Sequence, residues 1–195
     1  MKGLKISALI LAAAMLAMPL TACNQQKKPV SSGINVISSQ NQQGPGANGE
    51  NKATIDPNAA SNNFVFKYNG VSIVVNSPMN DILGSLGNNY QYFEAASCAG
   101  QGISKFYTFN GGSFVVSTNP VGNIDSIAMI TINDDSVSTA EGIFIGNTVD
   151  QLKAAYGEPK EKDGTTYTYE KGTSVLVFLV DDGGKITNII YNAKV

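Results

Sequence analysis

Few side chains in this chain of 195 residues could carry out chemistry. It contains no histidine and, read residue by residue, no arginine. A histidine-based triad, a Cys/His dyad, a histidine-ligated metal and an arginine clamp on a phosphate therefore cannot be built from it. For a nucleophile, a general base or a metal ligand the sequence offers a few lysines, the two cysteines Cys23 and Cys98, and some paired acidic residues.

The paired aspartates are Asp134-Asp135 and Asp181-Asp182. Neither pair has the alternating ligand spacing of a calcium loop. The second pair is followed by two glycines at a point where a hairpin must turn, so turn chemistry is favoured over a metal site. We expect neither a metal nor a cofactor.

Cys98 lies in the segment Ser97-Cys98-Ala99-Gly100. A reactive thiol needs a neighbouring base or positive charge that lowers its pKa, and only a few lysines could supply one here. Free cysteine is among the most buried residue types. A buried structural thiol is therefore favoured, and an enzyme that uses Cys98 is the least favoured alternative.

The N-terminal residues have the pattern of an export signal. Two lysines precede an apolar run over residues 6–20, which is shorter than the roughly 18 residues of a membrane-spanning helix. The run ends in Leu20-Thr21-Ala22-Cys23, which resembles the lipobox of bacterial lipoproteins. This resemblance implies a signal peptide over residues 1–22, cleavage between Ala22 and Cys23, and diacylglyceryl and palmitate lipids on Cys23. The alternative is an ordinary signal peptide with a chance cysteine near its end.

Residues 23–62 are rich in Gln, Asn, Ser, Gly and Pro. Such a composition cannot bury enough surface to offset the entropy of ordering it, which predicts a disordered linker with a reach of roughly 35 Å. The whole chain has 13 basic against 15 acidic residues, and this balance argues against nucleic acid as a partner. We therefore expect a domain that a lipid anchor holds at the extracytoplasmic face of a bacterial cell membrane.

The remaining residues, 63–195, have alternating apolar patterns that predict one globular domain of two repeats, 63–135 and 136–195. In each repeat we expect a helix followed by three strands. A hairpin around Asn69-Gly70 opens the first repeat, whose helix is predicted to start at Ser77 as cap. Thr148 begins a capping box for the helix of the second repeat. The predicted strands are 106–109, 114–116 and 124–130 in the first repeat and 167–169, 175–180 and 186–191 in the second.

Aromatic residues alternate on corresponding strands of the two repeats. These are Tyr107 and Phe109 in the first repeat and Tyr167 and Tyr169 in the second. Alternation points each pair to one face of a sheet. If the helices cover the opposite face, the rings form an exposed surface suited to binding a protein or a glycan. If the helices cover the same face, the rings are core, and this interpretation is favoured because an amphipathic helix needs large apolar side chains beneath it.

Short motifs flank the second predicted helix. They are Gly142-x-x-x-Gly146-Asn147-Thr148, Leu152, Tyr156-Gly157-x-Pro159 and Tyr167-x-Tyr169. In these the second repeat resembles small lipoproteins of the BamE/SmpA type, and the tandem arrangement resembles the two halves of β-lactamase inhibitor protein. The chain is also similar to uncharacterised lipoproteins of Gram-positive gut bacteria. These resemblances imply an α+β fold in which duplicated helix-plus-three-strand units form an antiparallel sheet with two helices packed on one face.

Three functions are compatible with these features. The first is a lipid-anchored, monomeric and non-catalytic binding module that recognises a protein partner, as relatives of this fold mostly do. The second is a structural or assembly lipoprotein of the cell envelope, as the BamE resemblance implies. The third is a hydrolase or a thiol-based enzyme. We favour the first, because the side chains that catalysis most often uses are missing.

Overall fold

The computed structural model describes residues 57–97 and 102–194, all of which belong to one compact unit of the chain. Ala22, Cys23, Cys98 and most of the predicted linker lie outside the described residues. Within the described residues the fold is α+β, with one large antiparallel sheet and few helices. No helix in these two stretches is long and apolar enough to cross a membrane.

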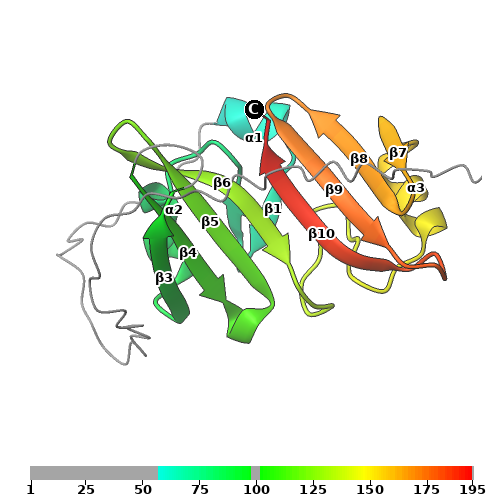
Figure 1. Cartoon of the computed structure of the whole chain (residues 1–195), viewed down its shortest axis with the longest axis horizontal. Helices are drawn as coiled ribbons and strands as arrows, with labels where there is room; N and C mark the ends of the chain where they lie inside the picture. Colours follow the sequence, from blue (N-terminus) through cyan, green and yellow to red (C-terminus); the bar gives the residue numbers. More distant parts are fainter. Residues whose placement is uncertain (1–56, 98–101, 195) are drawn as a thin grey trace, which may run out of the picture. The chain divides into compact units, whose positions relative to one another are not determined.

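Eight strands form the large sheet, in the order β3-β4-β5-β6-β10-β9-β8-β7 (Figure 1). Their bounds are β3 (Tyr90–Ala96), β4 (Ile103–Phe109), β5 (Phe114–Val121), β6 (Ile124–Ile132), β7 (Glu161–Asp163), β8 (Thr166–Lys171), β9 (Ser174–Val180) and β10 (Ile186–Ala193). A short 3-10 turn, η1 (Asn110–Gly112), joins β4 to β5. Strands β3 to β6 form one meander and strands β7 to β10 another, and β6 pairs with β10 where the two meanders meet.

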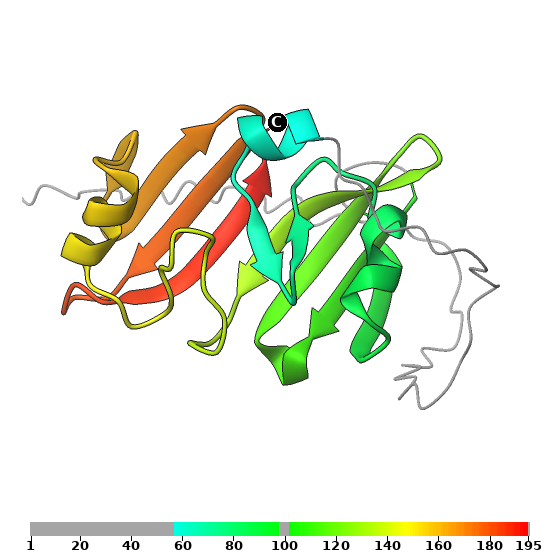
Figure 2. The ribbon, with the colours of Figure 1, turned by 180° about the vertical axis from the view of Figure 1, so that it is seen from behind.

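A helix precedes each meander: α2 (Asn80–Leu86) leads into β3, and α3 (Val149–Tyr156) leads into β7. Figure 2 shows α2 and the small hairpin of β1 (Phe66–Tyr68) and β2 (Val71–Ile73) in front of the sheet, so these elements cover one of its faces. The predicted hairpin turn is confirmed. Asn69 and Gly70 have φ angles of 49° and 79°, and a two-residue turn of this kind needs a positive φ at both positions.

The hydrophobic core lies between the sheet and the elements that cover it. Strands and covering elements both contribute to a single cluster of buried side chains. Its largest fully buried members include Phe66, Ile82, Phe114, Leu152, Phe178 and Tyr191. Because both meanders and both helices share this cluster, the two predicted repeats are packed as one unit.

The last residues of the predicted linker form a helix, α1 (Pro57–Asn62). The next residue, Asn63, holds this helix to the turn between β8 and β9. Its Nδ2 donates to the carbonyl oxygen of Ala59 at 3.0 Å, and its Oδ1 accepts from the backbone N–H of Thr173 at 2.8 Å. Gly172 in that turn has a φ of +58°, and a Cβ there would lie 2.1 Å from the carbonyl oxygen of Asn62. The linker prediction is therefore too long at its C-terminal end.

The prediction that Ser77 caps the first helix is wrong. Helix α2 begins at Asn80 and has no side-chain cap. The carbonyl oxygen of Ser77 instead accepts from the backbone N–H of Ile127 at 2.9 Å, and Pro78 forms an isolated bridge with Ser126. These backbone contacts hold the segment against β6, so the helix begins only after them.

The capping box of the second helix is confirmed. The hydroxyl of Thr148 accepts from the backbone N–H of Gln151 at 3.3 Å, and the Gln151 side chain accepts from the backbone N–H of Thr148 at 2.9 Å. Helix α3 therefore starts where the sequence places it.

Each meander has four strands, where the sequence patterns predicted three. The additional strands are β3 and β7, which lie at the two edges of the sheet. β3 reads YQYFEAA and β7 reads EKD, and neither alternates between apolar and polar residues. An edge strand makes ladder hydrogen bonds on one side only and buries less of its surface, so its sequence carries a weaker strand pattern.

Candidate functional site

The aromatic residues proposed above for a binding face lie in the core. Tyr107 and Phe109 of β4 are 4% and 1% exposed, and Tyr167 and Tyr169 of β8 are 6% and 5% exposed. They belong to the cluster that the helices and the β1–β2 hairpin cover. This corrects the exposed-face alternative: the covering elements need large apolar side chains beneath them, and these rings supply them.

Burial also sets the ionisation of two of these tyrosines. Burial, with a further contribution from the Asp125 carboxylate, raises the pKa of Tyr107 to about 12. Burial, followed by the nearby Glu158 carboxylate, raises the pKa of Tyr169 to about 12. Neither phenol is therefore tuned for acid–base work near neutral pH.

The residues that alternate with these aromatic side chains lie on the opposite face of the sheet, which we call the open face and which Figure 1 views. A first row crosses six strands in register and consists of Thr108, Val115, Thr131, Ile190, Val177 and Thr168. All of these side chains are partly exposed, and none carries a charge. The centre of the open face is thus a mixture of β-branched apolar side chains and threonine hydroxyls.

A second row runs parallel to the first and extends to the edge strand β3. It consists of Phe93, Phe106, Ser117, Met129, Asn192 and Val175, and it ends at Glu170 on β8. Phe93 is 59% exposed and Met129 is 39% exposed. The ring centroids of Phe93 and Phe106 are 5.8 Å apart. The open face is therefore aromatic near β3 and charged near β8.

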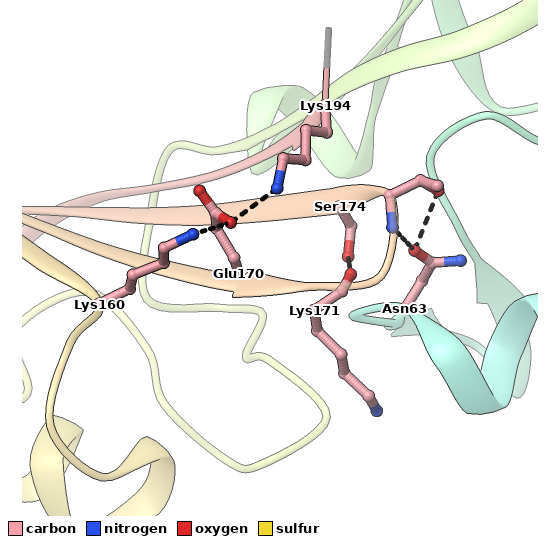
Figure 3. A network of polar contacts seen from close by, with 7 residues as sticks. Asn63, Lys160, Glu170, Lys171, Ser174 and Lys194 are labelled. Carbon is pink, nitrogen blue, oxygen red and sulfur yellow. Dashed lines mark hydrogen bonds and ion pairs between the residues drawn. The ribbon is translucent and has the colours of Figure 1, made fainter.

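Glu170 holds two lysines at the β8 end of this row, and we call these three residues the ion cluster (Figure 3). Its Oε2 lies 2.5 Å from the Nζ of Lys160 and 2.8 Å from the Nζ of Lys194. Hydrogen bonds from these two ammonium groups hold the pKa of Glu170 below its usual value. Because two ammonium groups meet one carboxylate, this end of the open face has a local excess of positive charge.

A groove with a volume of about 310 Å³ lies beside the ion cluster. Its lining combines three aromatic rings, Phe64, Tyr156 and Tyr169, with the charged residues Glu158, Lys160, Glu170 and Lys171. The ring centroids are 6.0 Å apart between Phe64 and Tyr156 and 5.4 Å apart between Tyr156 and Tyr169. Among the predicted aromatic residues, Tyr169 thus lines a surface depression. An aromatic surface beside charged groups suits a partner side chain with an apolar body and a polar end.

Hydrogen bonds from neighbouring elements fix three of the groove residues, Phe64, Tyr169 and Lys171. The hydroxyl of Tyr169 donates to the carbonyl oxygen of Gly157 at 3.2 Å, just beyond the end of α3. Ser174 Oγ accepts from the backbone N–H of Phe64 at 2.8 Å. It also donates to the carbonyl oxygen of Lys171 at 2.7 Å (Figure 3). The groove is therefore formed where α3, β8 and the residues after α1 meet.

Tyr156 links the groove to the core. Its hydroxyl donates to the carboxylate of Glu141, and burial is the largest of the effects that raise its pKa. Its ring lies 5.4 Å from the ring of Phe178, measured between centroids. With these contacts Tyr156 is held in place from both sides, so the aromatic part of the groove is preformed.

The acidic pairs stabilise turns. Asp181 Oδ1 accepts from the backbone N–H of Lys185 at 2.8 Å, which confirms the predicted turn chemistry. Asp134 Oδ1 accepts from the backbone N–H of Ser136 at 2.9 Å, and hydrogen bonds from Ser136 hold the pKa of Asp134 below its usual value. Within residues 57–97 and 102–194, no group of three His, Cys, Asp or Glu side chains is placed to hold a metal ion.

Sequence reasoning missed the open face, although one signal for it is present. Strand β9 reads SVLVFLV, with Val175, Val177 and Leu179 between its buried residues. An antiparallel strand with one solvated face usually alternates apolar and polar residues. Apolar side chains therefore lie on both faces of β9, although those on the open face are only partly buried.

Comparisons with known proteins identify no family for this chain. No protein-family description matches it, and no curated protein matches it. Three solved structures are similar at TM-scores of 0.37 to 0.39. The first is a DUF4309 family protein, YjgB, from Bacillus subtilis, which is 17% identical over 62% of this chain and 82% of its own. The second is the uncharacterised protein yfeY from Escherichia coli, which is 14% identical over 62% of this chain and 92% of its own. The third is an extracellular protein containing a SCP domain from Bacillus anthracis, which is 7% identical over 78% of this chain and 50% of its own. None of the three is described as a BamE-type lipoprotein, so that resemblance stays a prediction.

Proposed function

We propose that this chain is a lipid-anchored extracytoplasmic binding module that recognises a protein partner and catalyses no reaction. The observation that carries the proposal is the open face, where the row from Thr108 to Thr168 crosses six strands without a charge. Strands lie about 4.8 Å apart, so six of them span roughly 25 Å. This is the scale of a standard protein–protein interface.

The chemistry of the open face supports a protein partner. Specific interfaces combine an apolar centre with a polar rim. Here Val115, Ile190 and Val177 lie in the first row, and the ion cluster lies at the β8 end of the second row. Threonine hydroxyls among them can donate and accept hydrogen bonds. The charged end orients a partner, while the uncharged centre supplies the buried area.

For the fold we propose a duplication of one unit, similar to BamE-type lipoproteins and β-lactamase inhibitor protein. The order of elements supports it, because a helix followed by a four-stranded meander occurs twice along the chain. The two meanders join through β6 and β10, the last strand of each. Duplication of this kind doubles the width of a single sheet, and so produces the broad face that the binding proposal needs.

For the location we propose a monomeric domain tethered through Cys23. Helix α1 ends beside the turn between β8 and β9, where Asn63 bonds to Thr173. The tether therefore joins the domain at the end of the sheet that carries this turn, which leaves the open face free of the attachment point.

Photo-crosslinking in the cells that make the protein tests this function. A benzoylphenylalanine is placed at Thr131, in the centre of the open face, and at Asp150, an exposed position on α3, as the matched control. We expect one protein to crosslink at Thr131 and not at Asp150. The added substitution Val177→Lys should reduce that crosslink at least tenfold, because it puts an unpaired charge into the interface. In the same cells Cys23→Ala should move the protein out of the membrane fraction.

Two results would overturn the proposal. One is the same set of crosslinked proteins at both positions, which would mean that the open face has no specific partner. The other is a Thr131 crosslink that Val177→Lys leaves unchanged, which would place the contact elsewhere. Turnover of a substrate by the purified chain would favour an enzyme instead.

A further inference from the structure

The two edges of the large sheet differ in how they are protected. β7 has three residues, Glu161–Asp163, all of them charged and exposed. Short, charged edge strands prevent the addition of another strand. The opposite edge, β3, has seven residues, contains neither proline nor lysine, and carries one charge, on Glu94. β3 therefore lacks the protection that β7 has.

We infer that the outer edge of β3 is a docking site at which an extended segment of the protein partner adds to the sheet as a further strand. In the described part of the chain β3 pairs only with β4. Alternate residues of such an edge point their N–H and C=O groups outward. These groups supply the main-chain hydrogen bonds of strand addition, and exposed side chains supply the selectivity. The inference rests on the proposed binding function and names the chemistry of the partner.

The inner side of β3 shows which side chains fit this strand. On β4, Phe106 lies opposite Phe93, and Lys105 lies opposite Glu94. The ammonium group of Lys105 pairs with Asp125 on β6, so within the described residues Glu94 has no salt bridge and an incoming cation can pair with it. The ring centroids of Tyr92 and Tyr107 are 5.3 Å apart. An incoming segment meets the same β3 side chains from the outer side. It should therefore carry a lysine or arginine beside Glu94 and an apolar or aromatic residue beside Phe93.

The side chains of β3 are placed for such a contact. Phe93 is 59% exposed and Tyr92 is 38% exposed. The Tyr92 hydroxyl donates to Glu94 Oε2 at 2.6 Å, which holds the carboxylate along the edge. A cation from the partner would lie close to both the carboxylate and the Tyr92 ring, and both attract it.

The edge is continuous with the open face. Phe93 begins the second row of that face and lies opposite Phe106. A strand added beside β3 would place its alternate side chains next to Phe93, in line with this row. A partner that rests on the open face can therefore also extend one segment along β3, and the two contacts would reinforce each other.

A synthetic peptide with the β4 sequence, ISKFYTF, is a suitable probe because β4 already pairs with the inner edge of β3. The blocked, fluorescein-labelled peptide is titrated with the full-length chain in a mild non-ionic detergent, and its anisotropy is recorded. Phe93→Lys puts a charge on the edge, as β7 has, and should weaken binding at least tenfold. Val121→Lys is the matched control, because Val121 is 63% exposed but is the last residue of β5, which does not lie at the β3 edge of the sheet. It should change the affinity less than twofold.

Two modified peptides separate strand addition from a simple apolar contact. N-methylation at alternate residues removes main-chain donors and should abolish binding. Replacing the peptide lysine by glutamate should weaken binding at least fivefold, because it would face Glu94. Gln91→Lys is a second edge variant if Phe93→Lys does not fold, and it should also weaken binding.

Three results would overturn the inference. The first is equal affinity of the peptide for the wild-type chain and Phe93→Lys. The second is full retention of binding by the N-methylated peptide. The third is that the chain forms a dimer, that the Phe93→Lys substitution dissociates this dimer, and that the peptide does not. A second copy of the chain, and not a partner segment, would then occupy β3. If the Thr131 crosslink persists in Phe93→Lys, the partner uses the open face without this edge, and the proposed function survives.

Discussion

The two halves of the domain hold their helices against the sheet in different ways. Helix α2 buries Ile82 and Leu86, and Met79 at its N-terminal boundary is buried as well. Helix α3 buries only Leu152, but its first turn is closed by the capping box of Thr148. The first half therefore relies on fully buried apolar side chains, and the second half on one fully buried side chain, the partly buried Tyr156 and a polar cap. Similar element orders can thus be stabilised by different balances of forces.

The largest expected effect concerns the apolar anchors. Leu152→Ala and Ile82→Ala should each lower the free energy of unfolding by about 3 kcal/mol, because each truncates a fully buried side chain. Their local consequences should differ. Without Leu152, α3 keeps only the partly buried Val149 and Tyr156 against the core, so its amides should lose protection from hydrogen exchange. Helix α2 keeps Leu86, and its amides should stay protected in Ile82→Ala.

Urea unfolding measures the stability change, and hydrogen exchange with mass spectrometry measures the local protection of each helix. The prediction is contradicted if the amides of α2 lose as much protection in Ile82→Ala as the amides of α3 lose in Leu152→Ala. That result would mean that the burial of Leu86 does not hold α2 independently.

Substitutions at the starts of α2 and α3 should have smaller and unequal effects on stability. Thr148→Ala removes the side chain that accepts from Gln151 and should lower the free energy of unfolding by about 1 kcal/mol. Ser77→Ala should change it by less than about 0.5 kcal/mol, because Ser77 bonds to Ile127 through its backbone and alanine keeps that bond. Thermal unfolding of both variants beside the wild-type chain measures the difference. Equal losses would show that Ser77 stabilises α2 in a way that its backbone contact does not explain.

These two helix starts also show how far the sequence predicts the fold. A Ser-Pro pair before an apolar stripe is a good local signal for a helix start. The backbone carbonyl of Ser77 instead accepts a hydrogen bond from Ile127 of β6. This long-range contact cannot be predicted from the residues next to Ser77. At Thr148 the local signal and the tertiary contacts agree. The pattern of Thr148 and Gln151 is therefore sufficient there.

The candidate site was less predictable than the fold. Alternation put Tyr107 and Tyr169 each on one face of the sheet, and the favoured interpretation of these rings as core agrees with their burial. The open face is formed by residues such as Val115, Thr131 and Ile190, which come together only through the pairing of β5, β6 and β10. Register between distant strands is not encoded in any single segment, so this row could not be assembled from the sequence.

The smallest expected effect distinguishes the corresponding tyrosines of the two halves. Tyr169→Phe should lower the free energy of unfolding at pH 7 by about 0.5–1 kcal/mol, because it removes the hydrogen bond to Gly157. Tyr107 forms no hydrogen bond through its hydroxyl within the described residues, so Tyr107→Phe should be close to neutral. A larger loss of stability in Tyr169→Phe than in Tyr107→Phe at pH 7 would support a contribution of the Tyr169–Gly157 hydrogen bond, whereas equal losses would contradict it.

At alkaline pH the two variants should behave alike. Burial raises the pKa of both tyrosines to about 12, while an unfolded tyrosine has a pKa of about 10. Below pH 10 both states keep the proton, and the contribution to stability is complete. As the pH rises from about 10 towards 12, the unfolded chain releases its proton first, so the native state loses stability. Phenylalanine has no such proton, and each variant should therefore lose less stability than the wild-type chain over this range. Urea unfolding at pH 7, 9.5 and 11.5 measures both comparisons, and a variant that follows the wild-type pH dependence would show that its tyrosine ionises equally in both states.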